Sequence, residues 1–85
     1  MILEIITPEK QVFTGEVTSV KFPGTSGEFE VQNNHAPIIS TLTSGVIRVI
    51  TSENNTENFD INGGVIEMQN NKIRQRLKME KYNKI

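Results

Sequence analysis

The 85-residue sequence contains no cysteine and no tryptophan, and it has only one histidine and one aspartate. Without cysteine, the chain has no disulfide framework, no thiolate nucleophile and no cysteine-ligated metal site. No apolar run approaches the ~20 residues of a membrane-spanning helix, and Glu4 lies where a secretory signal would be uncharged. We therefore expect a small cytosolic protein that is stabilised by packing alone.

The sequence is also poor in catalytic groups. His35 alone could act as an acid or base, but no nucleophile elbow, zinc-binding helix motif, phosphate-binding glycine loop or Rossmann fingerprint occurs. Glu28 and Glu30 are two residues apart and so share one face of a strand, yet magnesium or calcium would need more oxygen ligands. We expect no cofactor, no metal site and no catalysis, while an enzyme using His35 as its base stays a third hypothesis.

The residues that are abundant favour β-structure. Ile, Val and Thr together provide 26 of the 85 residues, against one Ala and three Leu. Such β-branched residues fit pleated, half-buried strands better than helices. The length allows one domain. Alternation of polar and apolar residues and runs of β-branched residues predict short strands over residues 2–7, 16–22, 28–32, 38–42, 46–51, 58–61, 65–68 and 72–77.

Glycine, proline and asparagine separate these strands at short intervals. Breakers over residues 23–27, 33–37, 62–64 and 70–71 predict turns, and Gly15 predicts a bulge or a close backbone approach. Residues 52–57 are polar and are expected to form a loop. This spacing is typical of a sandwich or barrel of antiparallel strands.

The charges are unevenly distributed along the chain. Residues 1–70 carry three basic and nine acidic side chains, whereas residues 71–85 carry six basic and one acidic. We expect residues 78–85 to be a short basic tail, frayed or starting a helix, because so short a helix does not hold without docking. A basic tail can bind nucleic acid or an anionic membrane, or can simply be a solvated terminus, which is the interpretation we favour.

Six motifs occur in the order and spacing of a known family. They are Ile6-Thr7-Pro8-Glu9, Val12-Phe13-Thr14-Gly15-Glu16-Val17, Pro23-Gly24-Thr25-Ser26-Gly27-Glu28, Asn34-His35-Ala36-Pro37-Ile38, Gly45-Val46-Ile47-Arg48-Val49 and Ile61-Asn62-Gly63-Gly64-Val65-Ile66-Glu67. Through these motifs the chain resembles, over about residues 2–73, the N-terminal β-sandwich domain of the epsilon subunit of F-type ATP synthase, called delta in mitochondria.

The resemblance implies an all-β fold: a flattened antiparallel β-sandwich of short strands over residues 1–77, followed by the tail. It also implies a non-catalytic subunit of the rotor stalk, which couples the membrane ring of c subunits to the gamma subunit in proton-driven ATP synthesis. The complex is then the enzyme. The chain would lie at the cytoplasmic face of a bacterial inner membrane, peripheral to it through the complex.

The resemblance further implies two sets of contact residues. Contacts with the gamma subunit are expected at Thr7, His35, Ala36, Pro37 and Ser40, and contacts with the c ring at Thr25, Ser26, Gly27 and Glu28. Each set has a plainer interpretation, since Gly27 suits a tight turn and His35 could serve to shape its own loop. An interface also leaves apolar side chains exposed on the free subunit, and we expect these among Ile38, Ile39 and Val46.

The sequence departs from the family at its C-terminus. Typical epsilon subunits continue into two antiparallel helices that can restrain ATP hydrolysis and in some bacteria bind ATP, so the resemblance implies neither activity here. Arg74-Gln75-Arg76 also stands where the resemblance implies a more apolar strand, and this departure bears on how the strand docks. The alternative function is a small nucleic-acid-binding β-barrel; it would need exposed aromatic residues among basic ones, whereas the four Phe lie at core-like positions or beside turns.

Overall fold

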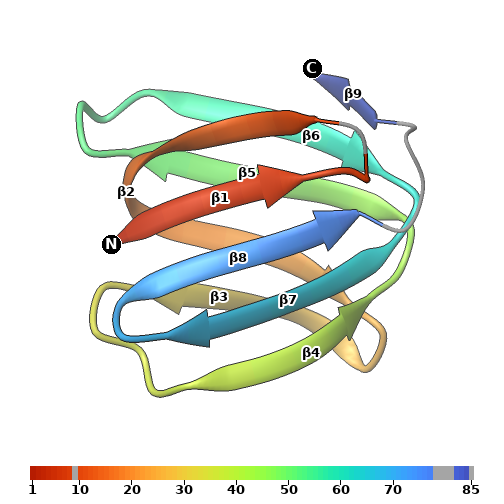
Figure 1. The fold of residues 1–85 in the computed structure, drawn as a ribbon, viewed down its shortest axis with the longest axis horizontal. Coiled ribbons are helices and arrows are strands. Elements are labelled where there is room, and N and C mark those ends of the chain that lie inside the picture. The colour runs from red at the N-terminus through yellow and green to blue at the C-terminus, as the bar shows by residue number, and fades with distance from the viewer. Residues whose placement is uncertain (9, 78–81, 85) are drawn as a thin grey trace.

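The fold consists of strands in the part of the chain that the computed structural model describes, residues 1–8, 10–77 and 82–84 (Figure 1). Nine strands follow along these residues: β1 (Ile2–Ile6), β2 (Gln11–Gly24), β3 (Gly27–Gln32), β4 (Ile38–Leu42), β5 (Gly45–Thr51), β6 (Thr56–Ile61), β7 (Gly64–Gln69), β8 (Lys72–Leu77) and β9 (Tyr82–Lys84). No helix that could cross a membrane occurs among the described residues. The all-β prediction is confirmed.

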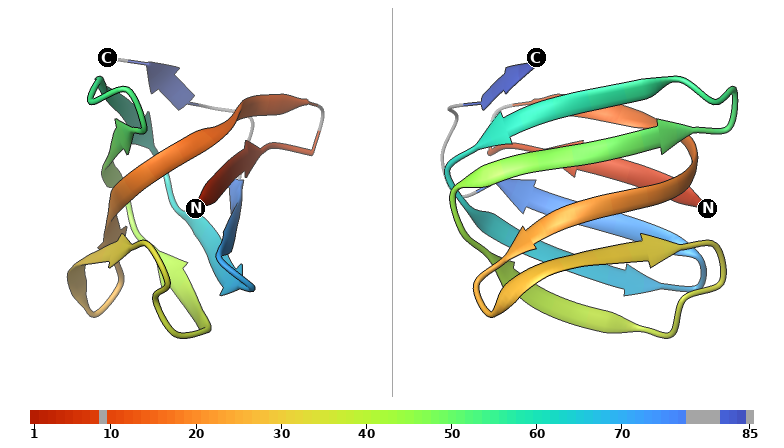
Figure 2. Two further views of the ribbon diagram at one scale, coloured as in Figure 1. Left: turned by 90° about the vertical axis from the view of Figure 1, so that its left-hand side faces the viewer. Right: turned by 180° about the vertical axis from the view of Figure 1, so that it is seen from behind.

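The strands form two layers that share one long strand, β2. The first half of β2 pairs antiparallel with β1, and the second half pairs with β5 and β3. The order β4-β7-β8-β1-β2 makes one layer, and β3-β2-β5-β6-β9 makes the other. Figure 2 shows β2 passing from one layer to the other, and its pairing with β5 has a register irregularity between Val17 and Ser19. The architecture is the expected β-sandwich.

One pairing departs from the expected antiparallel arrangement, because β1 pairs parallel with β8. Strands joined by a short turn can only pair antiparallel. β1 and β8 lie near opposite ends of the chain, so no turn fixes their relative direction. The Cα framework measures 28 × 25 × 21 Å, so the flattening of the sandwich is slight.

The boundaries of the expected strands agree with the sequence pattern to within one residue, except at β2 and β6. β2 runs from Gln11 to Gly24 rather than over residues 16–22, and β6 begins at Thr56, within the stretch expected to be a loop. Gly15 pairs regularly with Leu3, so no bulge occurs there. A Cβ at this position would lie 3.3 Å from the Phe13 ring, so the tight contact here is with a side chain and not with another backbone.

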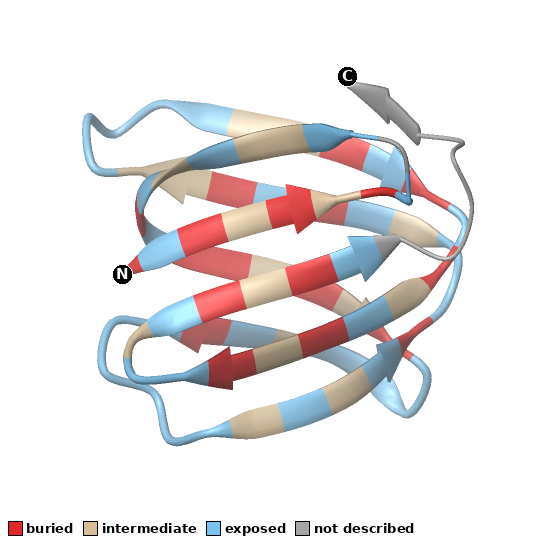
Figure 3. Cartoon of the chain, viewed as in Figure 1, coloured by how far each residue is buried: buried red, intermediate tan, exposed pale blue. Residues whose placement is uncertain are grey.

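The core lies between the layers and is filled by the inward-facing side chains of each strand. Alternating buried and exposed residues run along β1, β7 and β8 in Figure 3. The buried apolar residues are Met1, Leu3, Ile5, Val17, Val20, Phe22, Val31, Leu42, Ile47, Val49, Phe59, Ile61, Ile66, Met68 and Ile73. Phe13 and Phe29 pack against this cluster, at ring-centroid distances of 5.9 Å from Phe59 and 5.5 Å from Phe22 respectively. All four phenylalanines therefore serve packing.

The segment expected to be a frayed tail or the start of a helix contains the short strand β9. Its backbone pairs antiparallel with β6, with Phe59 opposite Lys84. The edge of β6 supplies hydrogen-bond partners that an isolated terminal segment lacks, and this explains why the backbone is extended here. Residues 78–81 and 85 of the expected tail lie outside the described residues, and the boundary at residue 77 stays a prediction.

The strand with the polar sequence Arg74-Gln75-Arg76, β8, lies inside its layer. It pairs with β7 on one side and β1 on the other. Alternation directs Arg74 and Arg76 outward and Gln75 inward, where Gln75 is fully buried opposite Ile66 and Ile5. Neither polar atom of its side chain has a hydrogen-bond partner among the described residues.

We predict that Gln75→Met stabilises the protein. Methionine has a similar, unbranched shape without the two unpaired polar atoms, whose burial costs about 1–3 kcal/mol. Urea unfolding should show a gain of about this size, and the exposed Gln69→Met control should change stability by less than about 0.5 kcal/mol. A loss of stability in Gln75→Met would mean that the buried amide is satisfied in solution.

Candidate functional site

The two sets of expected contact residues lie mainly at opposite ends of the sandwich. The loop at residues 33–37 joins β3 to β4 at one end, and the turn at residues 25–26 joins β2 to β3 at the other (Figure 1). Thr7 follows β1, and β1 ends at the same end of the sandwich as the 25–26 turn, opposite to the loop at residues 33–37. The structure thus does not bring the whole expected gamma set together.

Thr7 is held within its own turn. Only 8% of the residue is exposed, its backbone N–H donates to the carbonyl of Lys10 at 2.9 Å, and its hydroxyl also bonds Lys10. Ser40 lies in the middle of β4, where its hydroxyl donates to the carbonyl of Thr41. The loop residues at the other end are the more accessible part of the set.

We define the loop surface as His35, Ala36, Pro37 and Ile39. The side chain of Ile39 is the most exposed large apolar group in the described chain, at 73%. It stands opposite Glu67 of β7, and beside it lies a groove of about 430 Å³ lined by Pro37, Ile38, Ile39, Glu67, Met68 and Gln69. The loop surface therefore combines an exposed apolar side chain with a concave neighbourhood, as a docking site does.

His35 also shapes the loop that carries it. Its backbone N–H donates to the carbonyl of Gln32 at 3.1 Å, and Asn34 before it has the left-handed φ of 63°. The ring Nδ1 lies 2.7 Å from the carbonyl oxygen of Ala36. A carbonyl can only accept, so Nδ1 carries the proton and, in the neutral ring, Nε2 is left as an acceptor.

We define the turn surface as residues 25–28, all of which are exposed. Gly27 has a φ of 128°, a conformation that other residues rarely adopt, and this explains the glycine. Thr25 fastens the turn to β4, with its hydroxyl 2.9 Å from that of Thr41 and its N–H bonded to the Thr41 carbonyl. Glu28 forms an exposed ion pair with Lys21 at 3.3 Å, a kind of contact that adds little stability.

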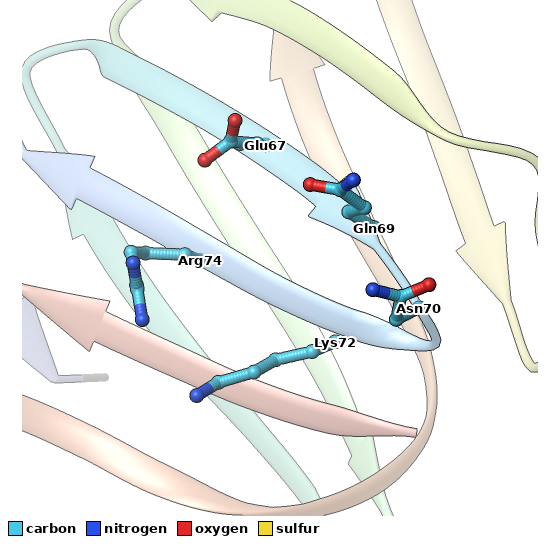
Figure 4. Close-up of a pocket in the computed structure, with 5 residues that line it drawn as sticks. All are labelled: Glu67, Gln69, Asn70, Lys72 and Arg74. Carbon is cyan, nitrogen blue, oxygen red and sulfur yellow. The ribbon is translucent and has the colours of Figure 1, made fainter.

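A polar groove on the outer face of β7 and β8 was not predicted. Its lining is Glu67, Gln69, Asn70, Lys72 and Arg74, and its volume is about 270 Å³ (Figure 4). Arg74 Nε donates to Glu4 Oε1 at 2.9 Å, and Gln11 donates to the other oxygen at 3.1 Å. This hydrogen bond from Arg74 lowers the pKa of Glu4 below its ordinary value of 4.5.

The polar groove is lined by both acidic and basic side chains, so its charge favours no particular class of ligand. No group of three or more His, Asp or Glu side chains suited to a metal occurs among the described residues. Sequence reasoning missed the Arg74–Glu4 contact because it arises from the parallel β1–β8 pairing, which sets Glu4 opposite Arg74.

The expectation of exposed apolar side chains holds for two of three candidates. Ile39 is exposed, and so is Val46 of β5, at 43%, in the other layer. Ile38 packs against the core instead, because its side chain points inward from β4. Ile2 and Val65 are also exposed, on the outer face of the β1-β8-β7 layer.

Known proteins are similar to this chain in sequence. Residues 1–74 match the family described as ATP synthase, Delta/Epsilon chain, beta-sandwich domain. An ATP synthase epsilon chain of Chlorobium limicola is 44% identical over 70 residues, which cover 82% of this chain and 80% of that one. An epsilon chain of Pelotomaculum thermopropionicum is 42% identical over 71 residues, covering 84% of this chain but only 52% of the relative.

Two solved structures share the fold at low sequence identity. A chain of the Euglena gracilis mitochondrial ATP synthase, in a structure of OSCP, F1 and c-ring, superposes with a TM-score of 0.89 at 16% identity. The match covers 99% of this chain and 52% of that one. A chain of the Tetrahymena thermophila mitochondrial ATP synthase central stalk and c-ring gives 0.82 at 16% identity, over 98% and 65% of the two chains.

The strand arrangement defines the chain as a β-sandwich domain. The sequence matches then place it: the chain belongs to the delta/epsilon family of ATP synthase chains. Members of this family are stalk subunits, and the enzyme is the assembled complex. The family resemblance inferred from the motifs is confirmed.

We predict that the Glu4–Arg74 contact stabilises the protein only above acidic pH. Because the pKa of Glu4 is lowered in the folded state, the contribution is fully present above the ordinary value of 4.5 and is lost as the pH falls through the folded value. Glu4→Gln should therefore be less stable than the wild type at about pH 7 and nearly equal to it at about pH 2 in urea unfolding. The same stability deficit at both pH values would rule out the ion pair as its cause.

Proposed function

We propose that this chain is a stalk subunit of a bacterial ATP synthase that links the c ring to the gamma subunit. The loop surface docks on gamma, and the turn surface faces the ring. In this assembly the chain is peripheral to the membrane, on its cytoplasmic side, and it transmits rotation during proton-driven ATP synthesis. Family membership and the fold shared with chains of F1/c-ring and central stalk structures support this proposal.

One structural observation carries the proposal: both β3 and β4 run from one surface to the other, and β4 contacts each of them. At its start, Pro37, Ile38 and Ile39 belong to the loop surface and its groove. At its end, Thr41 bonds Thr25 of the turn surface. The five residues of β4 span about 17 Å, and along this length the strand pairs continuously with β7.

This linkage suits a part that transmits force. Packed protein interiors deform little, so a displacement at one end of a paired strand is passed on to the other end. Leu42 anchors β4 in the core, and the N–H of Thr43 donates to the carbonyl of Pro23, which ties the end of β4 to the end of β2, just before the turn surface. A subunit that only tethered its partners would not need its two contact surfaces to share a strand.

The nucleic-acid alternative has weaker support. Base stacking needs exposed aromatic rings, and the four phenylalanines lie in or against the core. Of the outward cations on β8, Arg74 is already paired with Glu4. Binding of an oligonucleotide that weakens steeply with salt would revive this alternative.

We predict a one-to-one complex with the gamma subunit of the same organism, measured by size-exclusion chromatography with light scattering at low and moderate salt. Ile39→Asp should weaken binding at least about tenfold, because it places a charge in an apolar contact. Val46→Asp is the matched control, since it alters an equally branched, exposed side chain of the other layer. Equal weakening by both variants, or no binding by the folded wild type, would contradict the proposed loop surface.

We predict that Glu28 adds electrostatic attraction towards the ring. In a binding assay between the gamma-bound subunit and detergent-solubilised c ring, Glu28→Gln should weaken association about three- to tenfold at low salt and much less at moderate salt. Glu30→Gln provides the control, since Glu30 is exposed on the same strand but outside the turn. If the two variants bind alike, the turn surface does not face the ring through Glu28.

A further inference from the structure

We propose that Asn71 is a positioning residue that holds the loop at residues 33–37 in the conformation that docks on a protein partner. This inference rests on the proposed function for the partner's identity, but the ordering of the loop can be measured without any partner. Asn71 is not itself part of the loop surface. It lies in the turn at residues 70–71, which joins β7 to β8.

The side chain of Asn71 uses both of its polar atoms on the loop. Its Oδ1 accepts a hydrogen bond from the backbone N–H of Asn34 at 2.8 Å. Its Nδ2 donates to Oδ1 of Asn33, also at 2.8 Å. The orientation of the amide is fixed by the first contact, because a backbone N–H can only donate and must therefore meet the oxygen.

The backbone of Asn71 adds a third connection. Its carbonyl accepts from the N–H of Ile2 at 3.2 Å, which ties the turn to the start of β1. Asn70 and Asn71 both have left-handed φ angles, 54° and 59°, the geometry of a tight two-residue hairpin turn. Such a turn is rigid, so the Asn71 side chain projects from a fixed base.

The loop has little else to hold it. Residues 33–37 are exposed, and they connect β3, which pairs with β2, to β4, which pairs with β7. The other hydrogen bonds of these residues in the described chain are local: His35 N–H to Gln32 and the His35 ring to Ala36. Asn71 thus provides the hydrogen bonds that fasten the start of the loop to the turn between β7 and β8, in the layer that does not contain β3.

Ordering the loop before docking affects affinity. A binding partner docks on only one conformation of the loop. The apparent dissociation constant is the intrinsic one divided by the fraction of free subunit in that conformation, so a less ordered loop binds more weakly. His35, Ala36 and Pro37 follow directly after the two asparagines that Asn71 holds. Loss of the Asn71 side chain should therefore weaken docking although no contacting group is removed.

The test compares Asn71→Gly with Asn70→Gly. Both variants place glycine at a left-handed position, where glycine is unstrained, and both increase the freedom of the unfolded chain to the same degree. The Asn70 side chain makes no hydrogen bond within the described part of the chain, so only Asn71→Gly removes the contacts to the loop. Asn71→Asp is the rescue variant, because its carboxylate can still accept from the Asn34 N–H.

Hydrogen exchange of the free subunit, followed by NMR, is the first readout. In Asn71→Gly, the Asn34 amide should exchange about tenfold faster, while buried amides such as that of Val20 keep their rates. Asn70→Gly and Asn71→Asp should leave the Asn34 rate within about twofold of the wild type. Unchanged Asn34 exchange in Asn71→Gly would overturn the proposal.

Affinity for the gamma subunit is the second readout. Asn71→Gly should bind about three- to tenfold more weakly than Asn70→Gly, and Asn71→Asp should bind nearly as the wild type does. Equal affinities of the two glycine variants, despite faster Asn34 exchange in one, would overturn the link between loop order and docking. Absence of gamma binding by the wild type would refute the proposed function instead, and the exchange experiment would still decide whether Asn71 orders the loop.

Discussion

The structure depends on β2, the one strand that belongs to both layers. Its first half pairs with β1 and its second half with β5 and β3, so the two sheets are joined by continuous backbone rather than only by side-chain contacts. Val17, Val20 and Phe22 fill the core from this strand, and its last residue, Gly24, pairs with both Gly27 and Leu42. A Cβ at Gly24 would lie 2.6 Å from the carbonyl oxygen of Gly27, so the end of β2 and the turn surface must be built together.

The parts of this fold that local chemistry determines could be predicted from the sequence. Alternation places Phe29 and Val31 inside and Glu28 and Glu30 outside, as the structure has them, because side chains of a strand alternate between its faces. The turns at residues 62–63 and 70–71 follow from glycine and asparagine, which tolerate left-handed backbone. Alternation also puts Ile38 and Ile39 on opposite faces of their strand, but it does not say which of the two faces outward; the structure shows that it is Ile39.

What could not be predicted depends on contacts between distant strands. The parallel pairing of β1 with β8 brings Glu4 to Arg74 across 70 positions of sequence, and no local pattern encodes that register. Gln75 belongs to a strand that is more polar than the resemblance implies. Hydrogen bonding to β7 and β1 holds this strand in place and buries the amide. The contact between Asn71 and the loop at residues 33–37 is of the same kind, since it joins two turns that the fold alone brings together.

These distant contacts also explain how one small domain can present two defined surfaces. Exposed loops are ordinarily the least ordered parts of a protein, and a surface made of them would bind poorly. Here each surface is fastened to a strand end of another segment: Thr25 to Thr41 at one end, and Asn34 to Asn71 at the other. The first contact lies near the end of β4, and the second holds the loop that leads into the start of β4. A substitution that removes either contact would make one surface less ordered while leaving the core intact. We therefore expect that affinity for the proposed partners can be changed without changing the stability of the fold.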